Sequence, residues 1–341
     1  MSGLAGQTSL FPPEPAPDPL LCWLWLAHVL GPASVHAGRV LDAFGGAQEA
    51  WEARDTAEFR LAAGEAAALR AQQLAPEQYH PLVMRCDDLG VRILPFDDPD
   101  YPLAFSRIPD MPLVLYCTGD PLWLNEPGAV GIVGSRKPTE YGLNAAADIG
   151  GELAQSGALI VSGLADGLDS AGHRAAVKNN CPTIAVMGVP IDRTYPAANV
   201  VLRHKIEQKG CVISEYPPAV RALAQMDFCS ATGSLRRSAR ALLVVEAQGK
   251  KRRHHVHRVS RRTLWQAGVR GARQHLLAQF RRHKRPFAGR QSACRVFCCG
   301  PAWPAGPAPA ERSGGDGKAA GASERERAEG AFLHRAAAPW H

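Results

Sequence analysis

Short apolar stretches alternate with amphipathic stretches between residues 129 and 218. Four of the stretches have the length of buried strands, and the three between them repeat apolar residues at helical spacing. The expected strands are 129–133, 158–162, 183–187 and 211–214, and the expected helices are 143–155, 170–179 and 199–209. This alternation predicts a doubly wound, extended Rossmann-like sheet of the α/β class, mostly parallel, with helices on both faces. A further apolar run, 241–245, is a candidate for one more strand.

The residues before this sheet follow a different pattern. Residues 1–19 are rich in Pro and Gly, and we expect them to be disordered. Residues 20–75 carry apolar side chains at helical spacing and predict a small helical domain. In this domain Gly31 separates two helical patterns, as in a helix-hairpin-helix unit, whose glycine turn can offer N–H groups to a phosphate. A packing domain without such a site is the alternative. Residues 76–248 are expected to form the Rossmann-like domain.

The formal net charge of +7 comes from one segment of the chain. Residues 250–295 contain fifteen Lys and Arg and no Asp or Glu, so the rest of the chain carries a net charge of −8. This segment also lacks the apolar periodicity that builds a core, and we expect residues 249–341 to form a basic, disordered tail. Positive charge alone therefore does not indicate that the folded part binds nucleic acid.

Cysteine usage and the hydropathy pattern favour a cytoplasmic protein. The nine cysteines are scattered, unlike those of a disulfide scaffold. The apolar run 20–30 is too short to span a bilayer and follows acidic residues, so we expect neither a secretory signal nor a membrane partner. A cluster of His and Cys imitates metal ligands, but its spacing fits no zinc pattern, and we expect no metal. Its members are His254, His255, His257, Cys294, Cys298 and Cys299.

Two glycine-containing loops follow the first two predicted strands. Gly134 allows the backbone to approach an anion, Ser135 can donate a hydrogen bond, and Arg136 offers a planar fork suited to phosphate. The spacing differs from the dinucleotide fingerprint, and a tight turn with a solvated arginine is the alternative. Because ligands of open α/β sheets bind beyond the carboxyl ends of the strands, we expect these loops to form one site.

The second loop supplies the remaining candidates. They are Ser162, Gly163, Asp166, Gly167, Asp169 and His173. Asp169 or Ser170 can cap the helix that follows, and we expect His173 in its first turn, facing the loop. A capped helix with a core histidine is the alternative. The sequence offers no nucleophile elbow and no carboxylate pair with a clear role, so we expect neither catalysis nor a cofactor.

Four motifs together resemble the DNA-processing protein A family, also called DprA or Smf. They are GIVGSRKPTEYGLNAA, LIVSGLADGLDSAGHRAA, TIAVMGVPIDRTYPAAN and ISEYPP, in the order and spacing of the family. The resemblance implies single-stranded DNA as ligand, protection of incoming DNA in natural transformation, and the recombinase RecA as partner. It implies that DNA phosphates lie near Gly134, Ser135 and Arg136, with the other six candidates around the neighbouring loop.

The resemblance stops abruptly at Phe228 and returns only at 241–247. The family's Arg-Asn-Arg run and its strand ending in Val-Pro-Gly are both missing, which removes support for the end of the sheet and for a homodimer. We interpret residues 229–240 and those after 248 as translated out of the ancestral reading frame, because shifted frames of a GC-rich gene give such compositions. An impaired copy, a nonfunctional remnant and a phosphoribohydrolase-like nucleotide enzyme remain alternatives.

Overall fold

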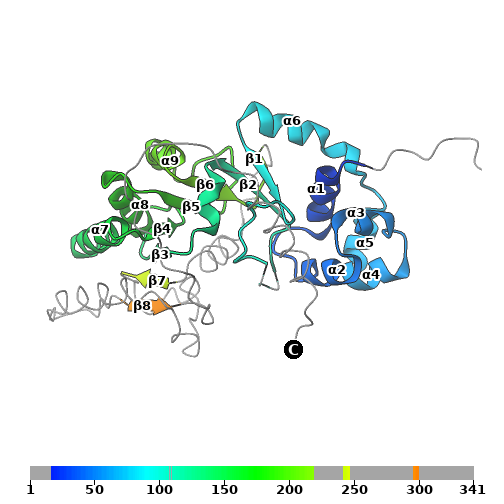
Figure 1. Ribbon diagram of the computed structural model, residues 1–341, viewed down its shortest axis with the longest axis horizontal. Helices are drawn as coiled ribbons and strands as arrows, with labels where there is room; N and C mark the ends of the chain where they lie inside the picture. Colours follow the sequence, from blue (N-terminus) through cyan, green and yellow to red (C-terminus); the bar gives the residue numbers. More distant parts are fainter. Residues whose placement is uncertain (1–16, 107, 109, 219–240, 246–294, 299–341) are drawn as a thin grey trace, which may run out of the picture. The chain divides into compact units, whose positions relative to one another are not determined.

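The computed structural model describes residues 17–106, 108, 110–218, 241–245 and 295–298 (Figure 1). Its helices are α1 (Pro19–Leu30), α2 (Ala37–Phe44), α3 (Ala47–Glu52), α4 (Ala57–Ala63), α5 (Glu65–Ala71), α6 (His80–Asp88), α7 (Glu140–Gln155), α8 (Leu168–Lys178) and α9 (Val200–Glu207). Its strands are β1 (Arg92–Pro95), β2 (Val114–Gly119), β3 (Ala129–Val133), β4 (Leu159–Ser162), β5 (Thr183–Met187), β6 (Cys211–Ser214), β7 (Ala241–Val244) and β8 (Arg295–Cys298). Short 3-10 helices span η1 (Pro76–Tyr79), η2 (Pro121–Asn125) and η3 (Ala197–Asn199).

The predicted helical region forms five short helices. The first, α1, begins at Pro19, where Asp18 accepts a hydrogen bond from the N–H of Leu20 at 2.8 Å, so part of the stretch expected to be disordered is ordered. Residues 1–16 lie outside the described residues. Helix α1 ends at Gly31, whose φ of 79° suits glycine. The domain boundaries inferred from sequence stay predictions.

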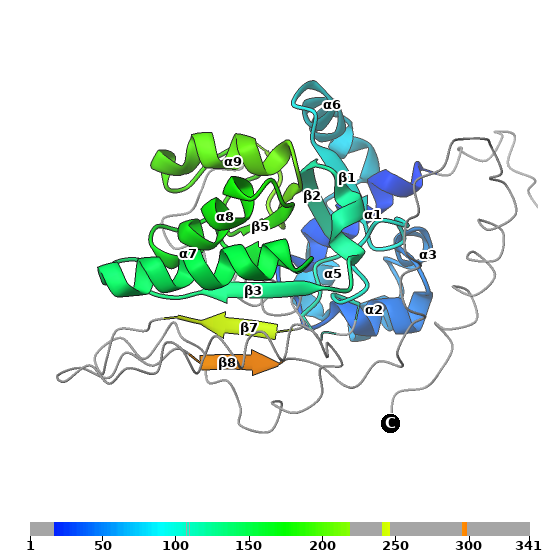
Figure 2. The ribbon, with the colours of Figure 1, turned by 60° about the vertical axis from the view of Figure 1, so that its left-hand side comes forward.

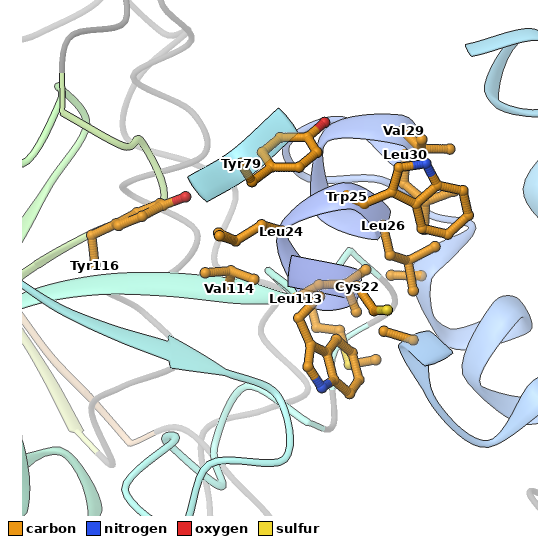
Figure 3. Packing of buried hydrophobic residues seen from close by; sticks show 14 of the residues in the cluster. Cys22, Leu24, Trp25, Leu26, Val29, Leu30, Tyr79, Leu113, Val114 and Tyr116 are labelled. Carbon is orange, nitrogen blue, oxygen red and sulfur yellow. The ribbon is translucent and has the colours of Figure 1, made fainter. Parts of the chain in front are cut away.

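Buried apolar side chains of α1 connect the helices with the sheet. Figure 3 shows Leu24 and Trp25 of α1, Tyr79 of η1, and Val114 and Tyr116 of β2 in one cluster, and all five are buried. Burying apolar area of this kind contributes about 25 cal/mol per Å² removed from water. The helical region and the sheet therefore share a core.

The sheet has eight strands in the order β1-β2-β6-β5-β4-β3-β7-β8. Strands β3 to β6 are parallel to their neighbours within this group, and β7 is parallel to β3 on its other side. Strands β1, β2 and β8 are antiparallel additions. The mostly parallel α/β sheet is confirmed, and the run 241–245 forms β7. The expectation that strand pattern ends near residue 248 is wrong, because β8 pairs with β7 (Figure 2).

Helices α7, α8 and α9 cover one face of the sheet and lie side by side (Figures 1 and 2). They share a face because each successive crossover moves the chain in the same direction. On the opposite face, the alternate residues of β3 to β6 pack with Tyr101, Phe105 and Leu124. Among the described residues, that opposite face is thus covered by the segment between β1 and β3, and not by helices following the sheet strands as the sequence predicted.

Candidate functional site

The loops expected to bind an anion gather at one edge of the sheet. Because β3, β4, β5 and β6 run parallel, their carboxyl ends meet there, and so does the end of β7. The order in which the chain adds strands changes direction at β3. From β3 the strands β4, β5 and β6 follow on one side, whereas β7 lies on the other side. Such a switch point is where open α/β sheets bind ligands.

The β3–α7 loop presents positive charge at this edge. The side chains of Arg136 and Lys137 are exposed, and Ser135 accepts a hydrogen bond from the N–H of Lys137 at 3.1 Å. Thr139 caps α7 by accepting from the N–H of Gly142 at 3.1 Å. The sixteen-residue α7 directs its positive dipole end toward the loop. The loop therefore combines two cations with a helix N-terminus.

Gly167 fixes the β4–α8 loop against the β3–α7 loop. Its φ is +83°, and a Cβ atom built there would lie 2.3 Å from the carbonyl oxygen of Ser135. The N–H of Leu168 donates to the same carbonyl at 3.2 Å. Only glycine fits this close approach, so the two loops predicted to form one site are in direct backbone contact.

Asp169 lies where the two loops meet. It does not cap α8, whose N-cap is Gly167; instead its Oδ2 accepts a hydrogen bond from the N–H of Gly163 at 3.2 Å. Burial raises the pKa of Asp169 to about 7, although the hydrogen bond from Gly163 and the nearby charge of Arg136 act in the opposite direction. Of the two caps expected for α8, Asp169 is thus wrong, and this carboxyl group instead stabilises the β4–α8 loop.

Two candidates lie beneath the loops. The hydroxyl of Ser162 is buried and donates to the carbonyl oxygen of Ile132. His173 is the sixth residue of α8, not in its first turn, and is fully buried; its Nδ1 is 2.8 Å from Oγ1 of Thr183. Burial lowers its pKa to about 3. The expectation that His173 faces the loop is therefore wrong, because the imidazole packs against β5.

Asn199 is a positioning residue that the sequence analysis did not assign to this site. Its Nδ2 donates to the carbonyl oxygen of Leu164 and to Oγ of Ser170, both at 2.9 Å, and its Oδ1 accepts from Arg174 at 3.1 Å. Leu164 is fully buried at a φ of 55°. Asn199 thus holds the β4–α8 loop from η3. Its polarity was visible in the sequence, but its partners lie 29 and 35 residues away.

Buried polar contacts also order two further loops at this edge, the third after β5 (188–196) and the fourth after β6 (215–218). Arg203 donates to the carbonyl oxygens of Ile191 and Arg193 at 2.6 and 2.9 Å and pairs with Glu207 at 2.8 Å. Ser214 at the end of β6 donates to the carbonyl oxygen of Val189 at 2.6 Å. The whole carboxyl edge is therefore preorganised by hydrogen bonds.

Neither a metal centre nor a membrane helix is found in the part of the chain that the structure describes. Within that part, no three His, Cys, Asp or Glu side chains are grouped so that they could hold a metal ion. Of the His and Cys cluster considered from sequence, all but Cys298 lie outside the described residues. No described helix combines the length and apolar character needed to cross a bilayer.

The motifs of this edge match a known family. The family of DNA recombination-mediator protein A matches residues 92–251, which include all four loops. This stretch of the chain is a domain of that family. A putative DNA processing protein DprA from Mycobacterium tuberculosis is 34% identical over 238 residues, covering 66% of this chain and 60% of that protein. The chain thus spans about three fifths of the length of such DprA relatives.

One solved DprA structure agrees with the fold. The X-ray structure of DprA from Streptococcus pneumoniae superposes with a TM-score of 0.57 at 25% identity, covering 67% of this chain and 79% of that one. DprA from Helicobacter pylori, for which a single-stranded DNA binding mode is described, matches with a TM-score of 0.43 at 30% identity, covering 47% and 71%. The DprA match ends at residue 251, close to where the sequence changes character.

Proposed function

We propose that this chain is a DNA-processing protein of the DprA type that binds single-stranded DNA at the carboxyl edge of its sheet. The family assignment supports DNA as the ligand. The observation that carries the proposal is the contact of Gly167 with Ser135, which joins the two loops beside the exposed Arg136. A fixed pair of glycine loops with neighbouring cations suits a phosphate backbone.

The candidates take different roles in this proposal. Arg136 and Ser135 contact phosphate, and Gly134 gives the backbone the room that this requires. Gly167 and Gly163 shape the second loop, whose exposed Asp166 lies at the rim. Ser162, Asp169 and His173 support the loops from beneath. Contacts of this kind position a strand without reading its bases.

The biological role that fits this binding is protection of incoming DNA during natural transformation and assistance in RecA loading. A homodimer belongs to the same proposal. Within the described residues of the edge no three side chains could hold a metal ion, and the role we propose for it is binding.

The test compares Arg136→Ala with Lys178→Ala in the full chain. Lys178 is exposed in the last turn of α8, at the opposite end of that helix from the loops, so its removal changes net charge equally. We expect Arg136→Ala to weaken oligonucleotide binding about 3- to 10-fold and to lower the salt slope by about 0.7, the value for one phosphate contact to a single strand. Lys178→Ala should change neither.

Site-resolved hydrogen exchange separates this edge from the basic segment 250–295, which can bind polyanions by charge alone. Addition of an oligonucleotide should protect the amides of residues 134–142 in the wild-type chain. If exchange there is unaffected and both variants bind alike, the edge is not the DNA site. Binding of a nucleoside monophosphate with release of its base would instead favour the phosphoribohydrolase-like alternative.

A further inference from the structure

The carboxyl group of Asp169 makes contacts from both glycine loops. It accepts from the N–H of Gly163 in the β4–α8 loop at 3.2 Å, and the N–H of Gly134 in the β3–α7 loop also hydrogen-bonds to it. Backbone amides at this edge are the groups expected to bind a phosphate. The chain has therefore supplied its own anion to the inner amides, and an incoming phosphate is left with the outer groups around Ser135 and Arg136.

The surroundings of Asp169 suit the neutral carboxylic acid as well as the carboxylate. Ser162 hydrogen-bonds to the carboxyl group and acts to lower the pKa of Asp169, and its hydroxyl also donates to the carbonyl oxygen of Ile132. With that proton held by Ile132, the Ser162 oxygen can accept a hydrogen bond from protonated Asp169. Donors from two amides and an acceptor from Ser162 keep the group satisfied in either state.

We propose that Asp169 is a positioning residue of the DNA-binding edge, holding the two loops together and taking up a proton when a DNA phosphate binds beside them. This inference rests on the proposed function. The physical reason is that a phosphate placed next to Arg136 repels an ionised Asp169 and offsets the favourable charge of the arginine. Binding therefore favours the neutral acid, and affinity falls as the pH rises and the free protein loses that proton.

Among the residues that the structure describes, Arg136 is the charged group that acts on Asp169. Arg136 approaches from the β3–α7 loop and favours the carboxylate. On its own segment, Asp166 is exposed, and His173 stays neutral because burial lowers its pKa to about 3. From η3, the uncharged Asn199 packs against the same loop. Since burial raises the pKa of Asp169 to about 7, its proton exchanges within the ordinary working range of pH.

Asp169→Asn provides the decisive variant, because the amide mimics the protonated acid. Its oxygen can accept from Gly163, and its NH₂ group can donate to Ser162 as the neutral acid would. Asp148→Asn is the matched control, since it removes an exposed carboxylate from the middle of α7, outside both glycine loops. The measurement is the Kd of an oligo-dT strand for the full chain and both variants between pH 6 and 8.5, at constant ionic strength.

We expect the Kd ratio of wild type to Asp169→Asn to be near one at pH 6 and to rise about 5- to 10-fold by pH 8.5. A shift of one pKa unit on binding corresponds to a tenfold change in affinity. Taking the ratio cancels the titration of histidines elsewhere in the chain. The ratio of wild type to Asp148→Asn should not vary with pH.

A second measurement follows the carboxyl carbon of Asp169 by NMR in the wild-type chain, so the test does not depend on the variant folding. Its titration midpoint should lie near 7 and should move up when oligo-dT is added. Binding with a flat Kd ratio or an unmoved midpoint overturns the role of Asp169 alone. No binding by any of the three chains at any pH overturns the proposed function, and the proton uptake with it.

Discussion

Replacing Gly167 by alanine tests whether the contact between the two loops holds the binding edge together. The new Cβ atom would lie 2.3 Å from the carbonyl oxygen of Ser135 and 2.9 Å from Cδ of Pro138. Both distances are far shorter than an ordinary contact, so the loops must separate by about 1 Å. The positive φ of +83° adds backbone strain to this clash.

Gly157→Ala is the matched control for the backbone strain. Gly157 has a φ of +87°, and a Cβ atom there meets nothing within 4 Å. We expect Gly157→Ala to lower the free energy of unfolding by about 1 kcal/mol, the usual cost of a positive φ outside glycine. Gly167→Ala should cost about 3 kcal/mol or more, because displaced backbone adds to the same strain.

Thermal unfolding and hydrogen exchange measure the two parts of this prediction. For a domain of this size the estimates correspond to a loss in Tm of roughly 2–4 °C for Gly157→Ala and 6–12 °C for Gly167→Ala. Amides of residues 134–139 should exchange faster only in Gly167→Ala. Equal destabilisation by the two variants, with unchanged exchange in both loops, would refute the argument that Gly167 joins them.

Three further predictions concern the support of the edge and the end of the chain. Asn199→Ala removes two buried hydrogen bonds and one partly buried hydrogen bond and should lower the free energy of unfolding by about 2–4 kcal/mol. Amide exchange around Leu164 should be faster, and denaturation and mass spectrometry measure the two effects. His173 binds a proton more readily in the unfolded state, so its contribution to stability is lost as the pH falls below about 6.5. His173→Gln should therefore make the unfolding midpoint depend less on pH, measured in denaturation curves between pH 8 and pH 5. Translation of the other two frames across codons 228–300 should recover an Arg-Asn-Arg run and a strand ending in Val-Pro-Gly, and their absence from both frames would contradict the frame-shift hypothesis.

The central strands were predictable because a strand that is buried on both faces is a continuous run of apolar residues. Strands β3, β5 and β6 have the bounds that the apolar runs predict. Helix ends were less accurate: α7 begins three residues before the predicted start, since Thr139 caps it. A capping threonine followed by Glu140 was a usable signal, because acidic residues favour the first turn. Strand β8 was not predicted, because the segment around it lacks the apolar periodicity from which the other elements were assigned.

The sequence was sufficient to predict where the candidate site lies, but not how its side chains are oriented. The order of strands and loops places both glycine loops at one edge, and the structure brings them into contact at Gly167. Residue spacing could not tell that Asp169 turns toward Gly163 or that His173 packs on Thr183. Those choices depend on tertiary packing, where short polar side chains have several local partners of similar energy.

Strand β7 connects the candidate site with the part of the sequence that departs from the family pattern after Phe228. Strand β7 lies beside β3, and the N–H of Val245 donates to the carbonyl oxygen of Val133, the last residue before the anion loop. Leu243 and Val245 are buried in the same cluster as Ile132 of β3 and Leu168 of α8. The short family-like run 241–247 therefore coincides with the segment that supports the loops from the side opposite β4. Because β7 is the second neighbour of β3, the described edge depends on that run, and β7 in turn pairs with β8 through Val244 and Arg295.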